Sequence, residues 1–206
     1  MPDAYVIPSS PQPACSAIIL AGGRASRMQG QDKGLIPLAG QPMIQHVLQR
    51  VAPQVQDIVI NANRSIADYT ALGYPVVNDQ VGEFAGPLAG IAAGLAICQQ
   101  DWALVVACDC PQLPLDLVAQ LFAARARQPL VILHDGQRLQ PLFMLIHRQL
   151  LPALQQALAQ QQAKVGQWCL AQHPAILRVA QPAAFANINT EAERLALEQQ
   201  LLQTNT

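Results

Sequence analysis

The segment Leu20-Ala-Gly-Gly-Arg-Ala-Ser-Arg-Met-Gln-Gly-Gln-Asp-Lys33 follows a short apolar run, Ala17–Leu20, which predicts a buried strand. Gly22 and Gly23 carry no Cβ, so their backbone can approach an anion closely. Successive backbone N–H groups in such a loop form a concavity that binds anions. The same loop carries three positive charges, on Arg24, Arg27 and Lys33. A loop of this composition at the end of a first strand predicts a polyphosphate site.

Apolar runs alternate with helical patterns along the rest of the chain, which is typical of an α/β fold with a mostly parallel sheet. The runs that predict further strands are 57–62, 74–79, 103–109, 130–133, 139–146 and 176–179. Helical spacing occurs at 42–52, 65–72, about 88–99, 115–122, 149–161 and 165–170, and a last helix follows the capping-box pair Thr190 and Glu193. We therefore expect one three-layer α/β/α domain with a Rossmann-like sheet. The runs around Asp135-Gly136 suggest an antiparallel edge.

Polar residues close three of the predicted strands: Asn61, Asp79 and Asp109. Right-handed crossovers bring such strand ends to one edge of the sheet, where open α/β sheets bind ligands. Asp109 ends a hydrophobic strand, and one carboxylate facing a nucleotide triphosphate suits Mg²⁺, which takes its other ligands from water and phosphates. Asp79 and Asp109 could instead be ordinary turn or helix-cap aspartates. The functional interpretation requires Lys33 and Asp109 to open onto one shared cleft.

Length and composition limit the remaining possibilities. A chain of 206 residues predicts a single domain, here residues 15–206, preceded by a disordered tail at 1–14 that holds four prolines and no basic residue. The net charge of −1 gives no general attraction to nucleic acid, and no apolar stretch is long enough to span a membrane. Five cysteines without a C-x-x-C pair indicate reduced packing residues rather than disulfides or a zinc site. Without a signal-peptide pattern, we expect a cytoplasmic protein.

The spacing of the first loop matches neither a P-loop nor the G-x-G-x-x-G dinucleotide fingerprint. Its pattern, L-A-G-G-x(3)-R-M-x-G-x-D-K-G, resembles the signature of nucleotidyltransferases that activate small molecules with a nucleoside triphosphate. Within that group, R-M-x-G-x-D-K-G-L most closely resembles the molybdenum cofactor guanylyltransferases, although Gln29 stands where these usually have glycine. The C-D-x-P motif around Asp109 resembles the metal-aspartate motif of the same family.

The resemblance implies a nucleotide-diphospho-sugar transferase-like fold and transfer of GMP from GTP to the terminal phosphate of molybdopterin, with release of pyrophosphate. It implies Mg²⁺ as cofactor, with Asp109 as metal ligand. We assign catalysis to Arg27, Lys33 and Asp109. We expect the nucleotide to bind at Leu20, Ala21, Gly22, Gly23, Lys33, Asn61, Asp79 and Asp109, of which the resemblance marks Leu20 to Gly22, Asn61 and Asp79. Asn187 and Asn189 resemble the family's N-x-N near the acceptor, although both could instead be turn and capping residues.

Three alternatives remain at this point. One is the cytidylyl version of the reaction, and another is a sugar-phosphate nucleotidyltransferase, which often carries an extra domain. The third is a catalytically silent carrier of nucleotide or cofactor, against which the intact Lys33 and Asp109 argue. The partners expected are GTP, molybdopterin, and proteins that deliver or insert the cofactor, with no nucleic acid and no membrane. We expect a monomer or weak oligomer.

Overall fold

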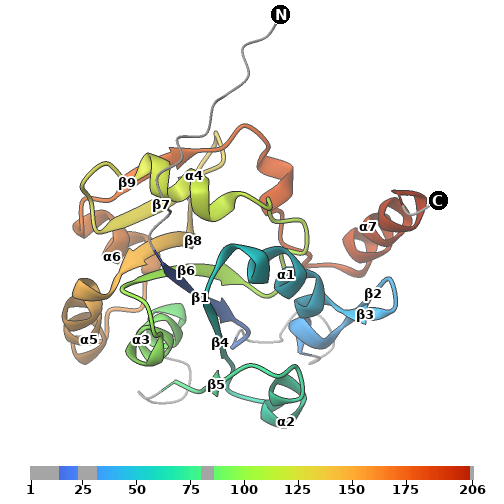
Figure 1. Cartoon of the computed structure of the whole chain (residues 1–206), viewed down its shortest axis with the longest axis horizontal. Helices are drawn as coiled ribbons and strands as arrows, with labels where there is room; N and C mark the ends of the chain where they lie inside the picture. Colours follow the sequence, from blue (N-terminus) through green and yellow to red (C-terminus); the bar gives the residue numbers. More distant parts are fainter. Residues whose placement is uncertain (1–13, 23–31, 80–85, 205–206) are drawn as a thin grey trace, which may run out of the picture.

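The computed structural model describes residues 14–22, 32–79 and 86–204, and its centre is a seven-stranded sheet in the order β5-β4-β1-β6-β8-β7-β9 (Figure 1). The strands of this sheet are β1 (Cys15–Leu20), β4 (Asp57–Asn61), β5 (Val76–Val77), β6 (Trp102–Ala107), β7 (Leu130–His134), β8 (Leu139–His147) and β9 (Ala175–Arg178). A separate antiparallel pair consists of β2 (Pro37–Leu38) and β3 (Gln41–Pro42). The predicted α/β fold with a mostly parallel sheet is confirmed.

The antiparallel strand lies inside the sheet and not at its edge, which corrects one detail of the prediction. β8 pairs antiparallel with both β6 and β7, whereas β9, at the edge, is parallel to β7. The β7–β8 turn is tight, because Gly136 has φ +97 and the Asp135 carboxylate accepts the N–H groups of Gln137 and Arg138. One strand position separates β7 from β6 in the sheet, and the hairpin places β8 in the gap between them.

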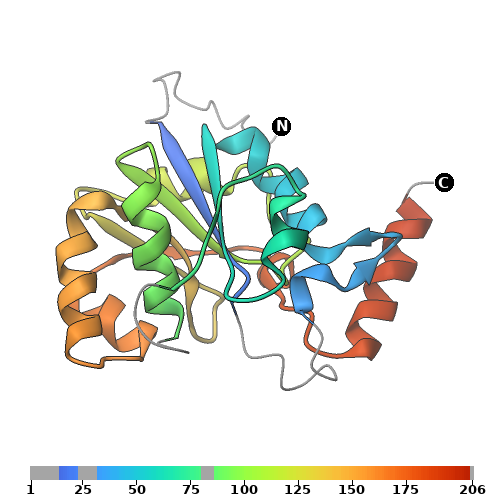
Figure 2. The ribbon, with the colours of Figure 1, turned by 90° about the horizontal axis from the view of Figure 1, so that it is seen from below.

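Helices cover both faces of the sheet, as Figures 1 and 2 show. One face packs against α1 (Met43–Val51) and α4 (Leu117–Ala124), joined by Tyr69 of α2 (Ile66–Thr70). The other face packs against α3 (Pro87–Ile97), α5 (Leu151–Ala159) and α6 (Val165–Ala171). Short 3₁₀ turns lie at η1 (Lys33–Leu35), η2 (Ala52–Gln54), η3 (Arg148–Leu150) and η4 (Pro182–Phe185).

The strands separate two hydrophobic clusters because successive side chains of a strand point to opposite faces. Ile19 belongs to the α1 and α4 side, and Ile18 to the α3 side. α3 lies unusually close to the sheet at Gly94, where a Cβ would come within 3.0 Å of three atoms of Ile18. This close packing fixes the position of α3 against β1.

The last helix, α7 (Glu191–Thr204), lies beside the β2–β3 hairpin in both views (Figures 1 and 2). A small cluster of buried side chains joins them: Leu38, Met43, Ile188 and Leu197. Arg194 donates a hydrogen bond of 3.0 Å to the Pro37 carbonyl, and Glu198 accepts the Ala39 N–H at 2.7 Å. The end of the chain is therefore anchored to the segment that follows Lys33.

Several local predictions change in detail. The strand predicted at 74–79 is only Val76–Val77, which leaves Asp79 in the following loop, and α4 begins after the exposed Leu115. The segment after Lys33 forms η1 and the β2–β3 hairpin, which no periodicity indicated. The five cysteines all belong to the described residues, and there they are free and buried, as predicted.

Two further expectations concern the chain ends and the membrane. Residues 1–13 of the expected tail lie outside the described residues. Among the helices described, none combines the length and the apolar character needed to cross a membrane.

Candidate active site

A pocket of about 450 Å³ lies at the carboxyl ends of β1, β4 and β6. This volume falls within the roughly 300–1,000 Å³ of typical small-molecule sites. The pocket is lined by Leu20, Ala21, Gly22, Asp32, Lys33, Asn61, Asp79, Gly86, Pro87, Ala107, Cys108, Asp109, Leu142 and Asn187. Lys33 and Asp109 thus open onto one shared cleft, as the functional interpretation requires.

One side of the pocket is built around Asp79. Asn61, the last residue of β4, donates from Nδ2 to Asp79 Oδ1 at 3.0 Å, and Asn63 donates to Asp79 Oδ2 at 2.9 Å. Asn63 Oδ1 accepts the Asp79 N–H at 2.9 Å in return. The two amides therefore hold the carboxylate in one orientation. Sequence reasoning missed Asn63, although its place two residues beyond Asn61 was a usable signal.

Two glycines permit this side to form. A Cβ on Gly22 would lie 3.0 Å from Asn63 Nδ2 and 3.3 Å from Asn61 Oδ1. A Cβ on Gly90 of α3 would overlap the Asn61 amide. Gly90 therefore serves the close packing of α3 against Asn61, and Gly22 lets the β1 loop pass beside the asparagine pair.

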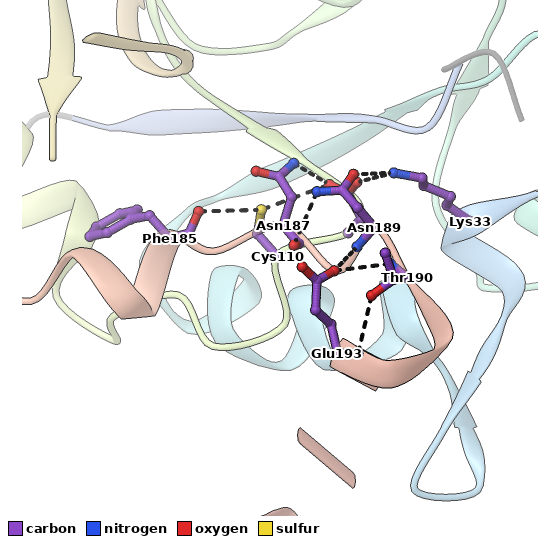
Figure 3. A network of polar contacts seen from close by, with 8 residues as sticks. Lys33, Cys110, Phe185, Asn187, Asn189, Thr190 and Glu193 are labelled. Carbon is purple, nitrogen blue, oxygen red and sulfur yellow. Dashed lines mark hydrogen bonds and ion pairs between the residues drawn. The ribbon is translucent and has the colours of Figure 1, made fainter. Parts of the chain in front are cut away.

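The other side of the pocket brings together Lys33, at the start of η1, and Asp109, two residues after β6. Lys33 Nζ lies 3.2 Å from Asp109 Oδ2 and donates to Asn189 Oδ1 at 2.6 Å. Figure 3 shows the hydrogen bond between Lys33 and Asn189. Asn187 Nδ2 donates to Asp109 Oδ1 at 2.8 Å. The predicted acceptor residues thus contact the predicted catalytic residues. Asn187 also lines the pocket, whereas Asn189 is outside the lining set.

A buried pair fixes the residue before Lys33. The Tyr69 hydroxyl donates to Asp32 Oδ1 at 2.5 Å, and Arg64 Nε lies 3.6 Å from Asp32 Oδ2. Burial raises the pKa of Tyr69 far above its usual value, so the hydroxyl stays protonated and donates. Sequence reasoning missed both residues. Asp32 could have been noticed as part of the motif, whereas Tyr69 gave no signal beyond a helical spacing.

The residues present fit a magnesium ion that is bound together with phosphates. Within the described ranges, no group of three or more His, Cys, Asp or Glu residues could cage a metal. Mg²⁺ needs no such cage, since one or two carboxylates with waters and substrate phosphates complete its octahedron. Asp109 places one carboxylate at the pocket. Burial raises the pKa of Cys108 and Cys110 well above the ordinary value, so both thiols are neutral in this structure.

Some predicted site residues lie outside the described residues: Gly23 and Arg27, together with Arg24 and Gln29. Their roles stay predictions. All other predicted nucleotide-binding residues line the pocket described above: Leu20, Ala21, Gly22, Lys33, Asn61, Asp79 and Asp109.

Comparison with known proteins matches residues 17–176 to the MobA-like NTP transferase domain. A molybdenum cofactor guanylyltransferase of Bordetella petrii is 46% identical over 184 residues, which cover 86% of this chain and 94% of that protein. A molybdenum cofactor guanylyltransferase of Shewanella loihica is 40% identical, with coverage of 91% and 97%. The crystal structure of molybdopterin-guanine dinucleotide biosynthesis protein A from Archaeoglobus fulgidus superposes with a TM-score of 0.73 at 20% identity, covering 91% of this chain and 99% of that one. This last likeness concerns the fold.

Proposed function

Because the chain belongs to the MobA-like NTP transferase family and is 40–46% identical to molybdenum cofactor guanylyltransferases, we infer that it transfers GMP from GTP to molybdopterin. The acceptor is the terminal phosphate of molybdopterin, and the products are the guanine dinucleotide form of the cofactor and pyrophosphate. One observation carries this inference beyond the family match. Lys33 and Asp109 meet in the pocket that also holds Asn61 and Asp79.

The reaction needs positioning and charge neutralisation more than covalent help from the protein. An oxygen of the acceptor phosphate attacks the α-phosphorus of GTP in line, and the bond to pyrophosphate breaks with its electron pair leaving on the pyrophosphate. Lys33 is proposed to neutralise the charge that develops on this leaving group, and Arg27 is proposed to assist it. No general base is required, because the acceptor phosphate is already ionised near neutral pH.

Asp109 is the residue proposed to hold Mg²⁺, and that ion would supply positive charge to the phosphates when bound. Asn187 holds Asp109 Oδ1 through a hydrogen bond of 2.8 Å and so limits rotation of the carboxylate. Lys33 forms an ion pair with Oδ2 of Asp109 at 3.2 Å. The chain thereby keeps the carboxylate oriented toward the pocket before substrates arrive.

The nucleotide is proposed to lie against Leu20–Gly22 with its base or ribose near Asp79, whose two oxygens are oriented by Asn61 and Asn63. Asn187 and Asn189 are proposed to lie at the acceptor side. We propose that the chain acts in the cytoplasm as a monomer or weak oligomer and passes its product to proteins that insert the cofactor.

The rival functions are less well supported. The relatives reported above are named guanylyltransferases, so a cytidylyl transfer is not favoured. A silent carrier would have no use for Lys33 and Asp109 converging at 3.2 Å inside the nucleotide pocket.

Product identification by mass spectrometry tests the proposal. The chain is incubated with molybdopterin and Mg²⁺, and with GTP or CTP in separate reactions. We expect the guanine dinucleotide product and pyrophosphate with GTP, and neither with CTP. A cytosine product, or binding of GTP without any product, would overturn the assignment. A reaction without Mg²⁺ tests the metal requirement, and we expect it to show no turnover.

A further inference from the structure

The segment 187–190, which joins η4 to α7, holds both reactive residues through its side chains. Asn187 donates to Asp109 at 2.8 Å, and Asn189 accepts from Lys33 at 2.6 Å. In Figure 3 the Lys33 side chain extends toward the Asn189 amide. The residues matched to the family model end at 176, before this segment begins.

The first half of the segment is fixed by burial. Ile188 is 6% exposed and packs with Leu38, Met43 and Leu197. Its N–H donates to the Asp109 carbonyl at 2.9 Å. Asn187 is therefore held beside Asp109 by its neighbour's packing and needs no further anchor.

The second half of the segment has a different anchor, Glu193. Thr190 and Glu193 form the predicted capping box, because the Glu193 N–H donates to Thr190 Oγ1 at 3.2 Å and Glu193 Oε2 accepts the Thr190 N–H at 2.9 Å. The same Oε2 atom also accepts the Asn189 N–H at 2.7 Å. This third hydrogen bond is additional to the capping box, and it fixes the backbone of the residue whose side chain holds Lys33.

Negative charge at the start of α7 does not explain this arrangement. Glu191 lies in the same first turn, yet its carboxylate accepts from Arg194 at 3.0 and 2.7 Å. Glu193 instead folds back onto the segment before the helix (Figure 3). The hydrogen bond from the Asn189 N–H lowers the pKa of Glu193, so its carboxylate is ionised and a strong acceptor at neutral pH.

We propose that Glu193 is a positioning residue for Lys33 and acts through Asn189. The proposal rests on the proposed function, in which Lys33 neutralises the leaving pyrophosphate. A lysine side chain is long and flexible, so its ammonium needs a fixed partner to stay in the reactive geometry. Glu193 fixes the backbone of Asn189, whose Nδ2 also donates to the Asn187 carbonyl at 3.3 Å. The Asn189 oxygen thereby lies 2.6 Å from Nζ and gives Lys33 a second partner beside Asp109 at 3.2 Å.

The experiment compares three variants of the full chain, Glu193→Ala, Glu193→Gln and Thr190→Ala. Glu193→Ala removes the acceptor of the Asn189 N–H, whereas Glu193→Gln keeps an accepting oxygen. Thr190→Ala is the matched control, because it breaks the capping box from the other side and leaves the Asn189–Glu193 hydrogen bond intact. For each variant, pyrophosphate release gives kcat and the KM for GTP, and thermal unfolding checks the fold.

We expect Glu193→Ala to lower kcat about tenfold while the KM for GTP changes less than about threefold, as befits a misplaced group that acts in the transition state. Glu193→Gln should retain most of the turnover, and Thr190→Ala should match the wild-type kcat despite a lower unfolding temperature. The proposal is overturned if Thr190→Ala loses as much turnover as Glu193→Ala, or if Glu193→Ala turns over normally. An inactive wild-type chain would instead refute the proposed function.

Discussion

Buried polar side chains lie both where the parallel strands begin (the amino edge of the sheet) and where they end (the carboxyl edge), and the pocket described above lies at the carboxyl edge. At the amino edge, Ser16 donates to Asp57 at 2.7 Å and accepts the Gln100 N–H at 3.1 Å, while Asp57 also accepts the Gln99 N–H at 3.2 Å. Ser16 is fully buried. At the carboxyl edge, the polar residues line a space of about 450 Å³.

The two edges differ in what their polar side chains face. The hydrogen bonds of Ser16 and Asp57 tie β1 and β4 to the loop after α3, so this cluster closes the end of the sheet. Asp79 and Asp109 are also held by amides, yet both remain in the lining of the pocket. Polar residues at a strand end therefore indicate a site only where the fold leaves room beside them.

The largest expected effect is that of Lys33→Ala. Removing the cation from the carboxyl edge should lower kcat by about 10²- to 10³-fold, the usual consequence of losing one group that stabilises developing negative charge. Pyrophosphate release measures the effect, and circular dichroism should show an unchanged fold. Arg125→Ala is the matched control, since Arg125 lies 4.9 Å from the Trp102 ring at the amino edge and should leave turnover unaffected. Wild-type turnover in Lys33→Ala would remove this residue from the mechanism.

An intermediate effect is expected from exchanging one carboxylate for an amide at each edge. Asp79→Asn replaces one carboxylate oxygen by an amide donor, which faces the donor of either Asn61 or Asn63, so GTP should bind about tenfold more weakly, equal to about 1.4 kcal/mol. Asp57→Asn should leave GTP affinity unchanged and lower only the unfolding temperature. Isothermal titration with GTP measures both. Equal losses of affinity in the two variants would contradict the contrast between the edges.

The smallest effect on function is expected from Ser16→Ala. The variant loses a partly buried hydrogen bond to Asp57 and leaves the Gln100 N–H without its acceptor, which should reduce the free energy of unfolding by about 1–2 kcal/mol. Turnover measured well below the unfolding temperature should stay at the wild-type level. Urea denaturation followed by circular dichroism gives the stability. A loss of turnover in the folded variant would mean that the two edges are coupled.

The sequence allowed the fold class and much of the pocket to be predicted because both depend on local patterns. Asn61 and Asp109 follow buried runs, and the parallel sheet brings such ends together. The interior place of β8 was not predictable, since a hairpin pattern does not say where its second strand inserts. Tyr69 and Glu193 were missed as site residues for a related reason. Tyr69 matters through its hydrogen bond to Asp32, which lies far away in the sequence. Glu193 matters through its hydrogen bond with the Asn189 N–H, which depends on backbone geometry.

The contact between Lys33 and Asn189 joins residues separated by 156 positions. During synthesis on the ribosome, the strands of the sheet emerge before the segment that anchors the lysine. We therefore expect a nascent chain to fold its sheet first and to become competent for transfer only when α7 docks on the β2–β3 hairpin. An assay that follows folding of the nascent chain and its release of pyrophosphate in parallel would detect this delay.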